Sequence, residues 1–341
     1  MRWLTILLSP WQKNSMRSLI VIILSFFCSY SCLAQFTDSI TNKVDSSYSN
    51  YRAYLSTKKS HPFIQLVKPF NLKTVNQQKN IVYSRAGKRK LLMDVFYPAK
   101  RDDKKLQTAI IMVHGGGWRS GDRSQHYPLL QKLANLGYTC FAPAYRLSTE
   151  ALFPAAVYDI KAAIRWVRAN AKKYHIDTSK IVMAGFSAGG ELAAFMATTG
   201  NMPLFEGNGG NANTASHINA LINIDGTLSF VHPESGEAND EKKISASTMW
   251  FGYSKKQNLP LLTIASPLTN ANANTPPALF INSSVARMHA GRKDYIEILN
   301  HHNIYTEIKE FENSPHSFCL FEPWFEPTVN TIDEFLKKIF K

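Results

Sequence analysis

Cysteine is scarce in this chain of 341 residues, and its four cysteines are poorly placed for a disulfide framework or a metal site. Cys28 and Cys32 lie near the N-terminus, Cys140 lies inside an apolar run, and Cys319 is far from it in the sequence. Their spacing matches neither a zinc site nor a thiol redox motif. We expect no metal and a buried, free Cys140, with a Cys140–Cys319 disulfide as the less favoured alternative.

Acidic residues are also few. The chain has 25 Asp and Glu against 39 Lys and Arg, so its formal net charge at pH 7 is +14. The basic residues are scattered, and no nucleic-acid recognition motif accompanies them. Nucleic acid is therefore not expected as a partner, while an anionic membrane surface, an acidic polysaccharide or simple solubility would each account for the charge.

No long apolar run suited to a stable membrane span is present: the run Leu19–Phe27 is too short. It follows the basic Arg17 and is followed by small residues, which is the pattern of a secretory signal. We predict a signal peptide at residues 1–34 and an exported, periplasmic or extracellular protein. A lipid anchor on Cys28 or Cys32 is less favoured, because neither cysteine follows a leucine and a run of small residues.

The chain is 45% hydrophobic and 19% charged, which excludes intrinsic disorder and collagen. Residues 35–79 are polar with weak periodicity and are expected to form a polar N-terminal segment. A single domain is expected at residues 80–341, opening with a hairpin at 80–83 and 91–97.

Within this domain, apolar runs of strand length alternate with helical patterns. The expected buried strands are Ala109–Val113, Tyr138–Ala142, Ile181–Ala184, Ala220–Ile224 and Ala278–Ile281. The expected helices are Tyr127–Leu136, Ala155–Tyr174, Glu191–Ala197 and Tyr295–Leu299, before a last strand Thr306–Phe311 and a last helix Thr328–Phe340. This alternation predicts an α/β fold with a mostly parallel central sheet flanked by helices. The polar stretches 200–217 and 232–275 are expected to be loop or cap insertions near the ligand site.

The sequence Gly185-Phe186-Ser187-Ala188-Gly189-Gly190 lies between an expected strand and an expected helix. A strand that turns abruptly into a helix forces its middle residue into a strained conformation, which requires small neighbours two residues away on each side. Gly185 and Gly189 meet that requirement, and Ser187 would stand at a helix N-terminus that favours developing negative charge. We predict that Ser187 is a nucleophile.

A glycine-rich sequence, His114-Gly115-Gly116-Gly117-Trp118, directly follows the strand expected at 109–113. Stabilising a tetrahedral oxyanion needs backbone N–H groups that converge on one point, and glycine permits the unusual dihedral angles involved. We expect Gly116, Gly117 and Ala188 to form an oxyanion hole.

A nucleophilic serine needs a base. Where the serine lies in a Gly-x-Ser-x-Gly turn between a strand and a helix of a parallel sheet, the histidine comes last in the chain. His316 follows the strand expected at 306–311 and is the candidate base. The other helical histidines are expected to be solvated: His126, His175, His301 and His302.

These motifs, in this order, resemble the α/β-hydrolase superfamily and its acetylesterase and hormone-sensitive-lipase-like branch. The resemblance covers about residues 80–341 and includes Ala144–Leu147 and Ile164–Val167. The stretches 276–292 and 314–325 are further similar to exported bacterial carbohydrate esterases that act on pectin.

The broader family usually carries its triad acid in a His-Gly-x-x-Asp turn after the strand matching Ala278–Ile281. This chain has Asn282-Ser283-Ser284 there, without an acid. Asp225, at the end of the strand 220–224, is the first candidate for the acid, and Asp294, at the start of the next helix, is the alternative.

Arg287, His289 and Arg292 cluster in the loop that would usually hold the acid. Arginine binds a carboxylate through two hydrogen bonds, so we expect these residues to bind a uronic acid. Trp118 is expected to bind substrate by stacking on a sugar ring, as Trp250 and Trp324 could also do.

Together these features predict a secreted serine esterase that removes methyl or acetyl groups from a pectin-like polysaccharide through an acyl-enzyme, without a metal or organic cofactor. The sequence leaves open a small-ester esterase, a lipase or a peptidase on the same fold. It also leaves open a carbohydrate-binding protein with weakened catalysis, because the acid is displaced.

Overall fold

The computed structural model describes residues 39–341 except 103, 201, 238–239 and 241–242. The predicted signal peptide at residues 1–34 lies outside the described residues. No helix among the described residues is long and apolar enough to cross a membrane.

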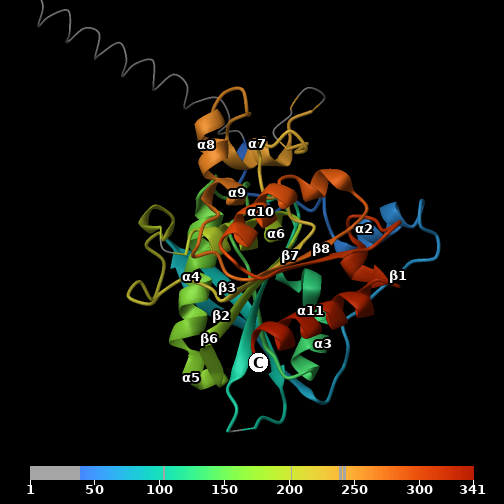
Figure 1. The fold of residues 1–341 in the computed structure, drawn as a ribbon, viewed down its shortest axis with the longest axis vertical. Coiled ribbons are helices and arrows are strands. Elements are labelled where there is room, and N and C mark those ends of the chain that lie inside the picture. The colour runs from blue at the N-terminus through green and yellow to red at the C-terminus, as the bar shows by residue number, and fades with distance from the viewer. Residues whose placement is uncertain (1–38, 103, 201, 238–239, 241–242) are drawn as a thin grey trace, which may run out of the picture.

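An eight-stranded sheet forms the centre of the molecule, in the order β2-β3-β5-β4-β6-β7-β8-β9 (Figure 1). Its strands are β2 Val75–Ala86, β3 Arg89–Pro98, β4 Gln107–Val113, β5 Thr139–Pro143, β6 Ile176–Phe186, β7 Ala220–Ile224, β8 Ala278–Asn282 and β9 Thr306–Glu310. β3 pairs antiparallel with β2 and β5, and the pairs from β5 to β9 are parallel. The predicted mostly parallel sheet is confirmed.

Two hydrophobic cores cover the two faces of the sheet. One contains apolar residues of α4 Ala155–Ala169, α6 Ala188–Thr198 and α10 Arg292–His301. The other contains those of α3 Tyr127–Asn135 and α11 Phe325–Ile339, and these two helices lie together in Figure 1. The central strands β5, β7 and β8 are buried along their whole length, which explains their uninterrupted apolar sequences.

Some expected elements differ from those observed. The helix expected at 155–174 is two helices, α4 and α5 Ala171–Tyr174. Asn170 lies between them with non-helical backbone angles, φ −101° and ψ 16°, and its side chain bonds to the Trp166 carbonyl at 2.8 Å. α6 starts at Ala188, before the expected Glu191, because Gly189 and Gly190 weaken the helical signal. β2 starts at Val75, five residues earlier than expected.

The stretch 232–275, expected to be irregular, contains three short helices: α7 Ala246–Phe251, α8 Leu259–Ile264 and α9 Pro267–Asn270. They are too short to show a clear apolar period, and they begin at polar caps such as Ser245 and Asn258. In Figure 1, α7 and α8 lie above one end of the sheet. The short 3-10 helices are Arg123–His126, Pro203–Phe205, Ala286–His289 and Phe318–Leu320.

The N-terminal segment packs on the domain. Helix α2 spans Asn50–Thr57, and β1 Gln65–Leu66 pairs antiparallel with β10 Phe321–Glu322. Asp45 binds the Arg119 guanidinium at 2.8 Å. The segment therefore contacts the loops that follow both β4 and β9.

Candidate active site

Ser187 lies at the sharp turn between β6 and α6, with φ 55° and ψ −122°. A positive φ is strained for a residue with a side chain, and the surrounding glycines permit it. A Cβ atom added to Gly185 would lie 1.9 Å from the Gly189 carbonyl oxygen, and one added to Gly189 would lie 2.2 Å from that of Val113. Both positions therefore require glycine.

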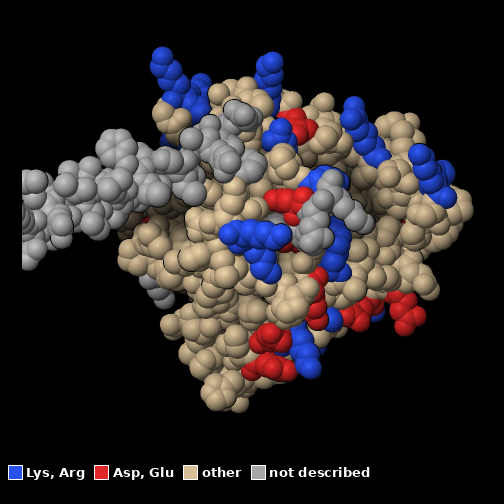
Figure 2. Space-filling model, turned by 90° about the horizontal axis from the view of Figure 1, so that it is seen from above, with Lys and Arg blue, Asp and Glu red and all other residues tan. Residues whose placement is uncertain are grey.

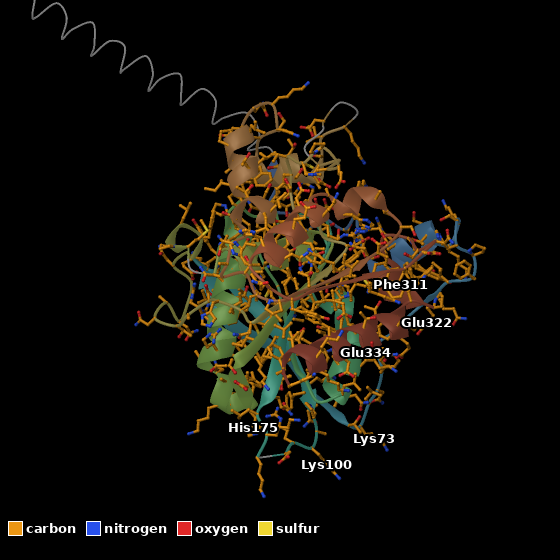
Figure 3. All side chains as sticks on the ribbon, in the orientation of Figure 1. Lys73, Lys100, His175, Phe311, Glu322 and Glu334 are labelled. Carbon is orange, nitrogen blue, oxygen red and sulfur yellow. The ribbon has the colours of Figure 1, made fainter. Side chains whose placement is uncertain are left out.

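Three side chains from distant parts of the chain form one line of hydrogen bonds. His316 Nε2 lies 2.9 Å from Ser187 Oγ, and His316 Nδ1 lies 2.8 Å from Asp225 Oδ2. Asp225 is fully buried at the end of β7, and His316 is in the loop after β9, which begins at Phe311 (Figure 3). Because the aspartate accepts the Nδ1 proton, Nε2 is left to accept the proton of Ser187.

Residues at the end of β8 hold the Asp225 carboxylate. Its Oδ1 accepts the backbone N–H of Ser283 at 2.8 Å and the Asn282 amide at 3.3 Å, and its Oδ2 accepts the Ser283 hydroxyl. His289 lies farther away, 3.9 Å from Oδ1, and its Nε2 is 2.8 Å from the Ser283 carbonyl oxygen. The sequence predicted that His289 binds substrate. In the structure His289 instead contacts Ser283, the residue that donates hydrogen bonds to Asp225.

The alternative acid, Asp294, is elsewhere. Its half-exposed side chain lies in the first turn of α10, 3.4 Å from His232 Nε2. Of the two carboxylates considered from the sequence, only Asp225 reaches His316.

The loop after β4 adopts the expected unusual conformation, with φ values of 121° at Gly116, 60° at Gly117 and 55° at Trp118. Gly117 and Ala188 line the cavity beside Ser187. The Gly116 carbonyl accepts the Ser120 N–H at 3.0 Å and closes the loop. The loop is thus held next to Ser187.

The cavity beside Ser187 has a volume of about 160 Å³. Its lining residues are Gly117, Trp118, Ser187, Ala188, Thr227, Glu237, Ala246, Arg287, Met288 and His316. Arg287 Nη1 faces Glu237 Oε1 at 3.7 Å, and the arginine side chain is 54% exposed. Arg287 is therefore the member of the predicted arginine and histidine cluster that the structure brings to the cavity.

Arg292 lies outside this cavity lining. Its guanidinium bonds to the Asn282 side chain at 2.8 Å and to Glu310 at 2.6 Å. Both partners are on neighbouring strands, β8 and β9, so the structure gives Arg292 a role in joining strand ends.

The sugar-stacking role expected for Trp118 does not agree with its burial. The side chain is 3% exposed, and its ring stacks on Trp250 with centroids 4.9 Å apart and an interplanar angle of 6°. Trp250 and Trp324 are buried too, at 0% and 8% exposed. Indole rings enclosed in this way offer no free face to a sugar.

The expectation that His126 is solvated is wrong. It is 2% exposed, and burial lowers its pKa to about 3. Burial likewise lowers the pKa of His114 to about 4. His126 packs edge-on against Phe186, so the helical pattern around it hides a core contact. His175 lies with Lys73 and Lys100 at the opposite end of the molecule from α7 and α8 (Figure 3).

Sequence reasoning missed several residues of the site. Ser283 supports the acid, Glu237 and Met288 line the cavity, and Glu191 is a buried acid one helical turn after Ser187. One signal for Ser283 was available in the sequence, because the turn at Asn282 has no acid where the broader family usually carries one. The other three carry no local motif.

Among the described residues, no group of three or more His, Cys, Asp or Glu side chains is arranged to hold a metal ion. Cys140 and Cys319 are both free and buried, which confirms the expectation for Cys140. On the face seen in Figure 2, Lys and Arg side chains are dispersed among Asp and Glu. The positive charge therefore forms no single continuous patch on that face.

The chain is similar to several esterases. Esterase LipC of Mycobacterium tuberculosis is 31% identical over 201 residues, covering 57% of this chain and 47% of that protein. Esterase LipQ of the same species is 30% identical over 202 residues, covering 59% and 47%. The chain thus spans about half the length of the curated relatives that it matches.

Solved structures share the fold. A truncated carbohydrate esterase from gut microbiota has a TM-score of 0.67 at 23% identity, covering 79% of this chain and 100% of that chain. The native form of esterase Est2 from the planctomycete Thermogutta terrifontis has a TM-score of 0.63 at 25% identity, covering 81% and 96%. These similarities confirm the α/β-hydrolase fold that the sequence motifs predict.

The sequence model of the BD-FAE family matches residues 93–287, which is more than half of the chain. The matched part includes Ser187, Asp225 and the loop 114–118, which we name the oxyanion loop after its predicted role. The chain therefore belongs to the BD-FAE family of α/β-hydrolase esterases.

Proposed function

We propose that this protein is a serine carboxylic-ester hydrolase in which Ser187 is the nucleophile, His316 the base and Asp225 the acid. The observation that carries the proposal is the continuous hydrogen-bonded line from Ser187 Oγ through His316 to Asp225. Family membership and the similarity to esterases support it.

In the proposed mechanism each of these three residues has one role. His316 Nε2 takes the Ser187 proton while Oγ attacks the ester carbonyl carbon, and the buried Asp225 stabilises the imidazolium that results. The N–H groups of Gly116, Gly117 and Ala188 would bind the oxyanion. The imidazolium protonates the departing alcohol as the intermediate collapses to an acyl-enzyme on Ser187.

The second half of the reaction uses the same groups. His316 removes a proton from water, the resulting hydroxide attacks the acyl carbonyl, and the proton returns to Ser187 Oγ as the carboxylic acid leaves. Because Asp225 is fully buried and held by Ser283, its carboxylate keeps the His316 ring in one orientation during both halves.

For the substrate, we propose a methyl or acetyl ester on a pectin-like, uronate-containing polysaccharide. Arg287 supports this, since its half-exposed guanidinium stands at the cavity beside Ser187 and matches a sugar carboxylate. A solved structural neighbour named as a carbohydrate esterase fits the same substrate class. We also propose export by the signal at residues 1–34, to be tested by N-terminal sequencing of the mature protein.

The test is to measure methanol and acetate released from a methylated and acetylated pectin, with 4-nitrophenyl acetate as a second substrate. Ser187→Ala should lower turnover by about 10⁴-fold or more. Ser179→Ala is the matched control, because Ser179 is an exposed serine bonded to Asp177 at the other end of β6. We expect the control to retain full turnover.

The outcomes separate the alternatives. Methanol release by wild type that is lost in Ser187→Ala establishes a methylesterase. Acetate release by wild type that is lost in the same variant establishes an acetylesterase. Cleavage of 4-nitrophenyl acetate without either product keeps the hydrolase and rejects the pectin substrate. No cleavage of any ester, together with no labelling of Ser187 by a fluorophosphonate in folded protein, rejects the hydrolase in favour of a binding protein.

A further inference from the structure

Glu191 is a fully buried acid that the mechanism above does not use. It lies in the first turn of α6, and its backbone N–H donates to the Ser187 carbonyl at 3.0 Å. Glutamate is rarely buried completely unless its side chain has a partner, because removing the carboxyl group from water is costly. The buried carboxyl group of Glu191 therefore needs a hydrogen-bond partner inside the protein.

That interaction is with Trp118. The indole Nε1–H donates to Glu191 Oε2 at 3.0 Å, inside the protein. Trp118 directly follows Gly117 in the oxyanion loop and has a positive φ of 55°, a strained conformation for a residue with a side chain. Contacts elsewhere must hold this backbone in place.

Two more contacts hold Trp118. Its ring stacks on Trp250 of α7, and its carbonyl accepts the Ser148 N–H at 2.7 Å. The bond to Glu191 differs from both because it ties the oxyanion loop to the helix that begins at Ala188. The amides proposed to bind the oxyanion come from these two segments, Gly116 and Gly117 from one and Ala188 from the other.

We propose that Glu191 is a positioning residue: by holding the indole N–H of Trp118, it fixes the Gly116 and Gly117 amides relative to Ser187 and Ala188. The inference rests on the proposed hydrolase function and goes beyond it, since it assigns a residue that never contacts substrate. Donors of an oxyanion hole must lie about 2.7–3.1 Å from the developing charge, so a small loop displacement is enough to weaken them.

The ionisation of Glu191 is consistent with this role. Burial raises the pKa of Glu191 well above its ordinary value, the hydrogen bond from Trp118 opposes this rise, and the nearby Glu237 adds to it. Its other oxygen, Oε1, has no hydrogen-bond partner among the described residues, which also disfavours the charged form. Both effects favour the uncharged form of the acid, and Oε2 of that form can accept the indole N–H of Trp118.

Three variants test the proposal on 4-nitrophenyl acetate. Glu191→Gln keeps a side-chain oxygen that accepts the indole N–H, and should lose less than about threefold in kcat. Glu191→Ala removes the acceptor, and Trp118→Phe keeps an aromatic ring but removes the donor. Each of these two should lower kcat by about 10-fold or more, with KM within twofold of wild type.

A second readout separates positioning from folding. A trifluoromethyl ketone forms an anionic tetrahedral adduct with an active serine, so its inhibition constant should rise with the loss of kcat/KM. The active fraction, titrated with a fluorophosphonate, should stay near that of wild type. Ile332→Ala, in α11 on the other face of the sheet, supplies a control for general destabilisation.

The double variant Glu191→Ala/Trp118→Phe should be no slower than the slower single variant, because both changes remove one bond. Independent, multiplying losses would overturn the proposal, as would a Glu191→Gln variant as slow as Glu191→Ala, or single variants with wild-type kcat. If wild type itself cleaves no ester, the proposed function fails and this role fails with it. If wild type is active and the variants are unaffected, only the role of Glu191 fails.

Discussion

Ser283 donates two hydrogen bonds to Asp225, one from its backbone N–H at 2.8 Å and one from its hydroxyl at 2.5 Å. Ser283 stands in the turn after β8, where the resemblance to the broader family leads one to expect the triad acid. Here that turn supplies hydrogen-bond donors, and the proposed acid, Asp225, lies at the end of the adjacent strand β7. From this position Asp225 Oδ2 lies 2.8 Å from His316 Nδ1.

Removing the Ser283 hydroxyl should slow the reaction without abolishing it. We expect Ser283→Ala to lower kcat by about 10-fold at unchanged KM, because a hydrogen bond to a charged group contributes about 1.5–3 kcal/mol and the backbone donor remains. Steady-state kinetics on 4-nitrophenyl acetate measure this. The matched control is Ser179→Ala, which removes a similar serine–aspartate bond remote from the site; equal rates for the two variants would contradict the supporting role.

The two candidate acids should behave differently. Asp225→Asn should lower kcat by about 10³–10⁴-fold, because the amide stabilises neither the correct His316 tautomer nor its imidazolium. Asp294→Asn should leave kcat within twofold of wild type, since its carboxylate faces His232. A large loss in Asp294→Asn and none in Asp225→Asn would reverse the assignment.

Substituting Arg287 should weaken the binding of acidic polysaccharide and leave the hydrolysis of neutral esters unchanged. We expect Arg287→Gln to raise KM for pectin about two- to fivefold, the scale of an exposed ion pair, with 4-nitrophenyl acetate kinetics within twofold of wild type. Added salt should narrow the difference between the two proteins on pectin. Arg89→Gln, which removes an exposed arginine paired with Glu150, is the control. Equal KM values for both variants on pectin would reject uronate binding by Arg287.

Acid should destabilise the fold through two buried histidines. The pKa of His114 is about 4 and that of His126 about 3 in the folded protein, against about 6.5 when unfolded. Their contribution to stability is complete above pH 6.5. It is lost as the pH falls from 6.5 towards 4, because the unfolded chain binds protons before the folded protein does. Each histidine lowers the free energy of unfolding by up to about 1.4 kcal/mol per pH unit.

His126→Phe should therefore reduce the loss of thermal stability between pH 7 and pH 4.5. Neither ring nitrogen of His126 has a hydrogen-bond partner among the described residues, so the change breaks no bond there. Melting temperatures across this range measure the effect, with His302→Phe on the surface as the control. An unchanged pH dependence in His126→Phe would show that His126 is not the group that titrates.

Patterns that can be read along the chain predict the fold class, which is confirmed, and they predict Ser187 and His316 as site residues. Apolar strands alternating with helical patterns predict a parallel sheet, and Ser187 and His316 are marked by a glycine-flanked turn and by chain order. The signal for Ser187 depends on neighbours within a few residues, and the signal for His316 depends on its place in the order of strands and motifs. The strained backbone at Ser187 requires glycine at positions 185 and 189, so the motif is visible in the sequence of this chain.

The acid that contacts His316 is visible in the three-dimensional fold and not in the sequence, because Asp225 and His316 are 91 residues apart and meet through the pairing of β7, β8 and β9. The same holds for Glu191, 73 residues from Trp118. A tryptophan next to an oxyanion loop looks alike in sequence whether it faces substrate or the core. Trp118 faces the core because it packs against Trp250 and donates a hydrogen bond to Glu191. Both partners are far from Trp118 in the sequence, so no local sequence pattern predicts these contacts.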